Sequence, residues 1–477
     1  MQDSKLIEIL KTLETKELTR FREYVHSPFF NKHKVVSKLC SYILSFAPNF
    51  DQPKLSKEVI FKHLFPKEKY NSTTIYTYTS NLLLLLTDYL ATLRFEQNQL
   101  QVKLYALQAL RSRGLVKQFN TTAKQYRGLL SKTIKDRDYH YYQAELYNEF
   151  DRINPVRNQD QNIQLKDTEL EIVFLIDKMQ IACDMINRNS IIGSNYKTSG
   201  IDLVLEWLES DKDYYLKFPE VRINYTIYKL IKTDKKEYYD DLRLFLADKT
   251  HLYPKEKIKL IYDYLINHCI KKMNTGDLDY FREFFELHRF LLEEEVLLLE
   301  DGTLDEWDYK NIVTAGARLK EFDWVETFIY EYKDFVKVSA RENVFNYNLA
   351  YYYFSKKNYS KTLKLLHQVE FTDPSYYIGA KIIQLKCYYV LDELEAALSL
   401  IATFRNYIQR SKVLSDYKKE MNQNMLKMAK KIAGLEFKKI TLSKNKLALE
   451  KEKLETQIRN YSPIANSDWL IEILEKI

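Results

Sequence analysis

Apolar residues recur along most of this chain at spacings of three and four positions, which is the period of one face of an α-helix. One clear example is the run Ile258, Ile261, Tyr262, Leu265 and Ile266. No stretch shows the sustained apolar–polar alternation of a half-buried strand. The pattern therefore predicts an all-α fold.

Caps and breakers set the expected helix boundaries, and Pro28, Pro48 and Pro66 each end a predicted helix. The predicted helices cover residues 16–26, 32–47, 56–65, 72–95, 121–135, 137–152, 163–188, 219–232, 234–247 and 254–273. Residues 154–162 are expected to form a loop. The role of the segment 153–200 stays open.

The second half of the chain shows self-similarity at a fixed interval. Trp324, Tyr359 and Leu394 are each 35 residues apart. Two further series keep the same interval: Thr327, Thr362 and Ala397, and Phe328, Leu363 and Leu398. A period of this length is typical of one helical hairpin per repeat.

One unit of this series, residues 348–374, matches a known pattern closely. Leu349 and Ala350 match its Leu-Gly pair, Tyr353 and Tyr359 its two aromatic positions, and Pro374 its closing proline. The unit resembles a tetratricopeptide repeat, and the overall layout resembles long helical-repeat proteins of bacteria. This resemblance implies an α-solenoid of antiparallel helical hairpins, with tetratricopeptide-like repeats in the C-terminal half, and no particular activity.

Composition agrees with long helices joined by short turns. Average usage predicts roughly 33 glycines and 24 prolines in a chain of this length, and this chain has 9 of each. We expect four regions: a helical N-terminal region (1–110), irregular helical hairpins (111–304), tetratricopeptide-like repeats (305–408) and a basic C-terminal helical cap (409–477).

Nothing in the sequence indicates a membrane span or export. The longest aliphatic run, Leu82 to Leu86, is far shorter than a membrane span, and the N-terminus lacks the basic start and apolar stretch of a signal peptide. We expect a cytoplasmic protein. The cysteines show no paired spacing and are expected to be small buried residues: Cys40, Cys183, Cys269 and Cys387.

The resemblance also implies a binding surface, because the first helices of tetratricopeptide repeats line an inner groove. The candidate groove residues are Asn311, Asn346, Asn348 and Lys381. Asn311 and Asn346 lie 35 residues apart, and Asn348 falls where the carboxylate-clamp members of the family place a ligand-binding asparagine. The companion lysine and arginine positions of that clamp do not match. The leading hypothesis is a protein–protein interaction scaffold that binds a peptide or protein partner.

Charge is unevenly distributed along the chain. Residues 405–459 carry 15 basic and 6 acidic residues, whereas residues 277–308 carry 2 basic and 12 acidic ones. The candidate basic patch comprises Lys418, Lys419, Lys427, Lys430 and Lys431. These lysines are either the solvated face of a capping helix or a patch for nucleic acid, an anionic membrane surface or an acidic partner.

The alternative hypothesis is a nucleic-acid-associated regulator. It would use the basic C-terminal helices or a helix-turn-helix-like unit built from residues 56–64 and 72–95. Lysines lie near that unit, but its second helix begins Thr73-Thr74-Ile75-Tyr76, without a basic residue to read bases.

The motifs of common catalytic sites are absent from the sequence: there is no GxGxxG, GxxxxGK, GxSxG or HExxH. We therefore predict no catalytic, cofactor-binding or metal-ligating residue, and no enzyme activity. The pairs Asp240–Asp241 and Asp277–Asp279 are expected to lie near turns as helix caps. In the turn 27–31, flanked by His26 and His33, Phe29 and Phe30 are expected to anchor the corner in the core.

Overall fold

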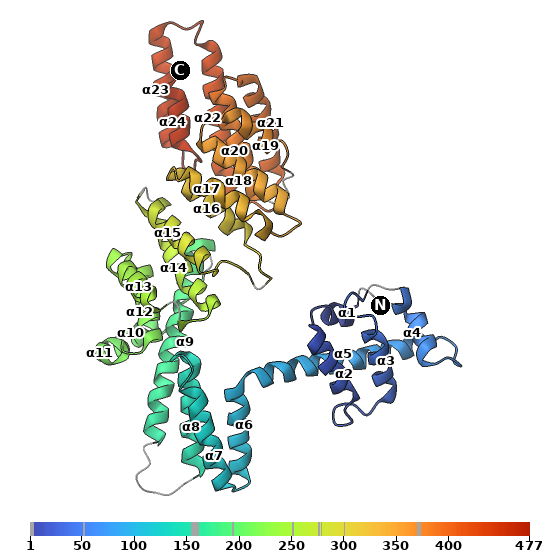
Figure 1. Cartoon of the computed structure of the whole chain (residues 1–477). Coiled ribbons are helices and arrows are strands. Elements are labelled where there is room, and N and C mark those ends of the chain that lie inside the picture. Colours follow the sequence, from blue (N-terminus) through green and yellow to red (C-terminus); the bar gives the residue numbers. More distant parts are fainter. Residues whose placement is uncertain are drawn as a thin grey trace. The chain divides into compact units, whose positions relative to one another are not determined.

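The computed structural model describes residues 4–50, 53–153, 162–192, 195–249, 252–274, 277, 279–299, 301–369 and 374–477. These residues form 24 α-helices and no strand, which confirms the all-α prediction. The chain divides into two compact units, Met1–Tyr225 and Thr226–Ile477, and the division falls within α12 (Pro219–Thr233). Figure 1 labels the helices along the chain.

Unit 1 contains an N-terminal core built by five helices, α1 to α5, and a second group of longer helices. Leu39, Ile43 and Phe61 belong to the first core, and Leu107, Phe119 and Tyr126 to the second. The helices are α1 (Lys5–Leu10), α2 (Thr15–His26), α3 (Lys34–Leu44), α4 (Lys57–Leu64), α5 (Ser72–Gln97), α6 (Gln99–Ser112), α7 (Val116–Leu130), α8 (Arg137–Ile153), α9 (Asn162–Ile192), α10 (Ile201–Ser210) and α11 (Lys212–Tyr215).

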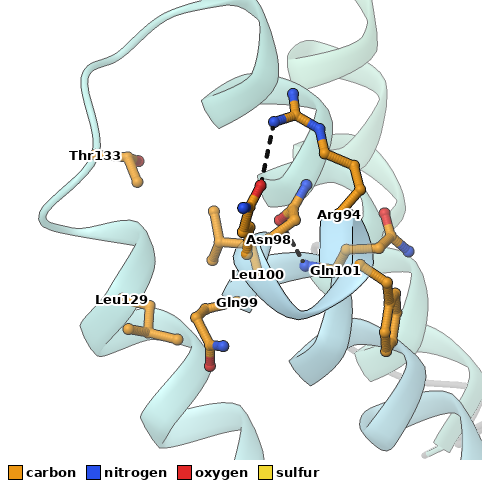
Figure 2. Close-up of a pocket in the computed structure, with 9 residues that line it drawn as sticks. Arg94, Asn98, Gln99, Leu100, Gln101, Leu129 and Thr133 are labelled. Atoms are coloured by element: carbon orange, nitrogen blue, oxygen red, sulfur yellow. Dashed lines mark hydrogen bonds between the residues drawn. The ribbon is translucent and has the colours of Figure 1, made fainter. Parts of the chain in front are cut away.

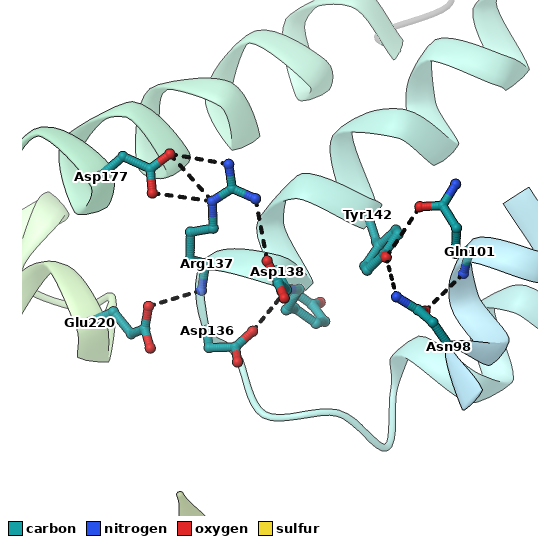
Figure 3. A network of polar contacts seen from close by, with 9 residues as sticks. Asn98, Gln101, Asp136, Arg137, Asp138, Tyr142, Asp177 and Glu220 are labelled. Carbon is teal, nitrogen blue, oxygen red and sulfur yellow. Dashed lines mark hydrogen bonds and ion pairs between the residues drawn. The ribbon is translucent and has the colours of Figure 1, made fainter. Parts of the chain in front are cut away.

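A polar network joins α8 to its neighbours in unit 1 (Figure 3). The Arg137 guanidinium donates to both carboxylate oxygens of Asp177 on α9, at 3.1–3.3 Å, and its backbone N–H donates to Glu220 on α12 at 2.9 Å. Tyr142, on another face of α8, accepts a 2.7 Å hydrogen bond from the side-chain amide of Asn98 at the α5–α6 junction. Bidentate arginine–carboxylate pairs fix orientation as well as distance, so the Arg137–Asp177 pair links the start of α8 to α9 in one geometry.

The turn between α2 and α3 differs from the sequence prediction. Phe29 is 86% exposed and Phe30 is 44% exposed, so the prediction that both anchor the corner in the core is wrong. The corner is held instead by Asn31, whose buried amide donates to the Val25 carbonyl at 2.8 Å and to Ser37 Oγ at 3.1 Å.

In unit 2, each helix from α14 to α23 packs on the next one along the chain. Tyr309 and Phe328 lie in its interior, and Leu385, Phe404 and Met425 belong to the core of its C-terminal part. Its helices are α13 (Lys236–Lys249), α14 (Lys255–Asn274), α15 (Tyr280–Glu293), α16 (Glu306–Arg318), α17 (Phe322–Glu331), α18 (Arg341–Ser355), α19 (Tyr359–Leu366), α20 (Pro374–Val390), α21 (Leu394–Arg410), α22 (Asp416–Lys438), α23 (Lys444–Asn460) and α24 (Ser467–Glu475).

In each of three consecutive helix pairs, α16–α17, α18–α19 and α20–α21 (labelled in Figure 1), a short turn joins the two helices. Each turn contains one residue with positive φ: Lys320 (64°), Lys357 (61°) and Asp392 (62°). These residues lie 37 and then 35 positions apart, because the stretch from the start of α17 to the end of α18 (322–355) has 34 residues and that from the start of α19 to the end of α20 (359–390) has 32. Counted from the turns, Phe322 rather than Trp324 corresponds to Tyr359, and Asn311 corresponds to Asn348 rather than to Asn346.

Candidate partner-binding surfaces

One face of α16 is left uncovered by the rest of unit 2. Tyr309, Ile312, Val313 and Ala317 pack inward and are buried. The opposite stripe carries Trp307 (43% exposed), Asn311, Thr314 and the exposed Arg318. These positions are three or four residues apart, so their side chains lie on one face of α16. That face presents an aromatic ring, an amide, a hydroxyl and a cation.

The N-terminal end of this stripe is part of an aromatic cluster. The Lys310 ammonium lies over Trp307, over Tyr347 of α18 and over Tyr376 of α20, at 5.0, 5.2 and 4.8 Å from the ring centroids. Gly379 makes room for this arrangement, because a Cβ there would lie 2.5 Å from the Tyr347 hydroxyl. Cation–π contacts with three rings position Lys310 and join the three helices α16, α18 and α20.

The C-terminal helix α24 covers the other end of α20. Lys386 donates to the Asn466 side chain at 2.8 Å and lies over the Trp469 ring at 5.6 Å. Trp469 also packs edge-on against Tyr389, with 5.5 Å between ring centroids. Burial and the charge of the neighbouring Arg318 both lower the pKa of Lys386. The uncovered surface on these helices therefore lies toward the end that carries Trp307 and Asn311.

The structure brings only part of the predicted groove together. Asn311 on α16 and Asn346 on α18 are half-buried, on helices that pack against each other. Neither amide has a hydrogen-bond partner among the residues that the structure describes. Lys381 lies on the other side of α20, since its ammonium is 5.3 Å from the Tyr377 ring, which packs on Tyr407 of α21 at 3.9 Å.

Asn348 is an interior residue with no exposed area. Its amide N–H donates to the Val344 carbonyl at 2.8 Å, and the side chain also reaches the Tyr376 phenol. Because Asn348 is fully buried, a ligand at the surface cannot contact it. Its side chain instead helps to hold α18 against α20.

Three of the five predicted basic residues line one groove. Lys427, Lys430 and Lys431 on α22 face Arg405 on α21 across a groove of about 560 Å³, which no acidic residue lines. Lys427 donates to the Tyr461 hydroxyl at 2.7 Å and Lys431 to Gln457 at 2.6 Å, both on the α23 side. We call this surface the cationic groove.

Lys418 and Lys419 lie one to two turns before the cationic groove and do not line it. Both belong to the first turn of α22, where Ser415 caps the helix and accepts from the Lys418 backbone N–H at 3.3 Å. Helical spacing along α22 did not predict Arg405, because this residue belongs to α21 and only the packing of α21 on α22 brings it to the lysines.

A further hollow of about 580 Å³ lies where α5, α6 and α7 meet (Figure 2). Its lining includes Asn98, which accepts from the Gln101 backbone N–H at 3.0 Å, and Arg94, which donates to Gln97 at 3.5 Å. Arg94 is its one charged residue. Such a lining provides hydrogen bonds but no pair of titratable groups for acid–base chemistry.

A cluster of perturbed titratable groups in unit 2 lies between α14, α15 and α16. Lys259 pairs with Asp263 at 3.3 Å and with Asp308 at 3.7 Å, and burial raises the pKa of both carboxyl groups. Burial also lowers the pKa of the neighbouring His288 to about 4. Because Lys259 pairs with Asp263 on its own helix and with Asp308 on α16, the cluster is an ion-pair network that joins α14 to α16.

The remaining polar candidates from the sequence lie within helices, cap them, or contact other residues of the fold. Asp279 is the N-cap residue of α15, whereas Asp240 and Asp241 lie inside α13, so the prediction that this pair caps a helix is wrong. His26 bonds to Ser41 and to the Arg22 carbonyl. His268 lies 3.2 Å from Asp234. All four cysteines are free and buried, as predicted.

Two searches of the described residues gave no candidate. They contain no group of three or more His, Cys, Asp or Glu side chains placed to hold a metal ion. None of the described helices combines the length and apolar character that crossing a bilayer requires. Comparisons with protein-family models, curated proteins and solved structures gave no match to this chain.

Proposed function

We propose that this protein is a non-enzymatic interaction scaffold, whose unit 2 is a tetratricopeptide-like helical-repeat array that binds a segment of a partner protein on its first helices. The observation that carries the proposal is the uncovered stripe of α16, Trp307–Asn311–Thr314–Arg318, beside the half-buried Asn346 of α18. A folded interior would bury Trp307, whereas binding surfaces favour tryptophan and arginine.

The recurring turns support the repeat interpretation. Lys320, Lys357 and Asp392 occupy the same place in three successive helix pairs, and each is followed directly by the N-cap residue of the second helix. The first helices pack on one another, α16 on α18 and α18 on α20. Stacked pairs with this connectivity present their first helices on a shared face, which repeat proteins use for binding.

The chemistry of the surface favours an extended segment with carboxylates. The exposed Arg318, whose guanidinium lies over the Phe281 ring at 4.4 Å, supplies a cation, and Asn311 and Asn346 supply amides that pair with the backbone of an extended chain. Trp307 offers a flat ring for an apolar or aromatic side chain.

The test is affinity capture of the tagged full-length protein from its own cells, with nuclease treatment and a salt series from about 50 to 200 mM. A defined protein partner that survives nuclease treatment and is lost from Trp307→Ala and Arg318→Glu variants supports the proposal. Lys364→Glu reverses the charge of an exposed residue on α19. It is the matched control, and we expect it to keep the partner. Asn348 is unsuitable for this test because it is buried. Equal capture by Trp307→Ala, Arg318→Glu and the wild type would sink the proposal.

A second candidate function is binding of a nucleic acid in the cationic groove. The observation that favours it is the convergence of Arg405, Lys427, Lys430 and Lys431 on one concave surface. A Lys430→Glu/Lys431→Glu variant would then lose most nonspecific binding to single-stranded RNA or DNA and show a shallower salt dependence. Binding that is absent at low salt, or equal in this variant, rejects this candidate.

A further inference from the structure

The turn between α2 and α3 is rigid and yet presents a phenylalanine to solvent. The Ser27 carbonyl accepts from the backbone N–H groups of Phe30 and Asn31, at 3.1 and 2.9 Å, and Ser27 Oγ accepts from Phe29 N–H at 3.4 Å. Asn31 Oδ1 accepts from the His33 N–H at 2.9 Å. These bonds fix the backbone on both sides of Phe29, whose side chain remains 86% exposed.

Phe29 belongs to a contiguous aromatic surface. Its ring meets Phe30 edge-on at 4.9 Å, and Phe30 stacks on Tyr24 of α2 at 4.0 Å. Tyr24 in turn packs on Tyr89 of α5 at 5.5 Å, which ties the surface to the core. Single exposed apolar residues are common on proteins, but three joined rings on a fixed turn are a feature of binding sites.

The turn and α3 are basic, whereas Glu17, Glu23 and Glu96 lie near Tyr89 at the inner end of the aromatic surface. Between Tyr24 and Phe50 the sequence contains three lysines, two histidines and no acidic residue. Lys32, Lys34 and Lys38 are exposed, and none of them forms an ion pair within the described part of the chain. A positive, unpaired rim attracts a negatively charged partner and speeds its association.

A groove of about 620 Å³ continues from the turn along α3. Lys34, Lys38 and Ser41 of α3 line it, together with His26 of α2 and His63 of α4. Its walls are fixed, because His26 bonds to Ser41 at 3.1 Å and the His63 ring packs on Tyr42 at 4.3 Å. Since the groove exists without a ligand, little ordering is needed when a partner binds.

We propose that the α2–α3 turn and the groove along α3 form a docking site for an acidic segment of a partner protein. Phe29 inserts between apolar side chains of that segment, and Lys34 and Lys38 pair with its carboxylates. The site lies in unit 1 and uses neither the stripe of α16 nor Asn346 of unit 2. A test of this site is therefore independent of a test of the scaffold function proposed above.

The probe for this site is a phage-displayed library of random peptides, selected on the immobilised full-length protein, followed by affinity measurement with synthetic copies of the selected peptides. We expect apolar residues flanked by Asp and Glu. Phe29→Ala weakens these peptides on the order of 30-fold, the size of a hot-spot loss. Lys34→Glu/Lys38→Glu slows association about tenfold at low salt and flattens its salt dependence.

Tyr76→Ala is the matched control, since Tyr76 is an aromatic residue of the same unit with 67% exposure. This variant and Trp307→Ala keep the affinity of the wild type. The proposal is overturned if the selected peptides bind Phe29→Ala as tightly as the wild type, or if all of them depend on Trp307. It is also overturned if Phe29 instead governs binding to phosphatidylserine-containing vesicles, which would assign the turn to a membrane surface.

Discussion

Arg111 on α6 donates from Nε to a carboxylate oxygen of Glu149 on α8, 2.6 Å away, and the Glu149 side chain has no exposed area. The arginine side chain is 26% exposed, so the pair lies at the boundary between the interior and solvent. A buried charge is tolerated only when it is paired, which makes α6 and α8 depend on each other through this contact.

Replacing Arg111 by alanine leaves the Glu149 carboxylate buried without its partner. We expect a loss of about 3 kcal/mol in the free energy of unfolding, the size reported for broken buried pairs. Denaturant titration followed by circular dichroism measures it. The double variant Arg111→Leu/Glu149→Leu should recover most of the loss, because it removes both charges. A single Arg111→Ala variant as stable as the wild type would contradict this account.

Glycine at position 316 is a packing requirement of the α16–α17 pair. A Cβ at Gly316 would lie 2.5 Å from Val325 Cγ2 and 2.8 Å from Phe285 Cε2. We expect Gly316→Ala to destabilise the protein by about 1–3 kcal/mol through overpacking. The matched control is Gly434→Ala within α22, where a Cβ meets nothing within 4 Å and alanine gains roughly 0.5–1 kcal/mol in helix propensity. Thermal unfolding of the two variants should therefore shift in opposite directions.

The sequence determines much of this architecture, because helix periodicity is a local property. The predicted range 254–273 differs by one residue at each end from α14, Lys255–Asn274. Periodicity does not reveal which neighbour a polar residue faces, so the burial of Asn348 against α20 was missed. Nor does it show that the hydrogen bonds of Asn31 hold the α2–α3 turn without help from Phe29.

The same limit applies to the candidate surfaces. Lys427, Lys430 and Lys431 share a helix, and their spacing predicted that they would lie together. Trp307 and Arg318 also share a helix, and spacing predicts that they lie on one face of it. Whether that face is exposed depends on where α24 packs, and α24 covers Lys386 rather than α16. The signal in the sequence that pointed to this face was Asn311, which the 35-residue spacing from Asn346 selected as a groove residue.

Acid should destabilise unit 2 through His288. Burial lowers the pKa of this imidazole from its ordinary 6.5 to about 4, so the unfolded chain binds a proton at a pH where the folded chain does not. The stabilisation is complete above about pH 6.5 and is lost as the pH falls toward 4, by about 3 kcal/mol in total. The raised pKa values of Asp263 and Asp308 act in the opposite direction at acidic pH.

The measurement is the free energy of unfolding between pH 7 and pH 4.5 for the wild type and for His288→Leu. The variant lacks the titrating imidazole, so its stability should fall less steeply over this range, whatever its stability at pH 7. Parallel pH dependences for the two proteins would show that His288 does not contribute.

The four cysteines allow the two units to be followed separately. Burial raises the pKa of Cys40, Cys269 and Cys387 to about 12, and it also raises the pKa of Cys183. Since the thiolate is the reactive form, iodoacetamide at pH 8 should label none of the four in the native protein and all four after unfolding. Peptide mass spectrometry identifies each labelled position.

In intermediate denaturant, labelling should occur in two groups rather than at four independent positions. Cys40 and Cys183 lie in unit 1, and Cys269 and Cys387 lie in unit 2. A compact unit opens cooperatively, so the thiols within one unit should become reactive at the same denaturant concentration. If Cys40 were labelled at a much lower concentration than Cys183, the N-terminal helices would unfold on their own, and unit 1 would consist of two cooperative parts.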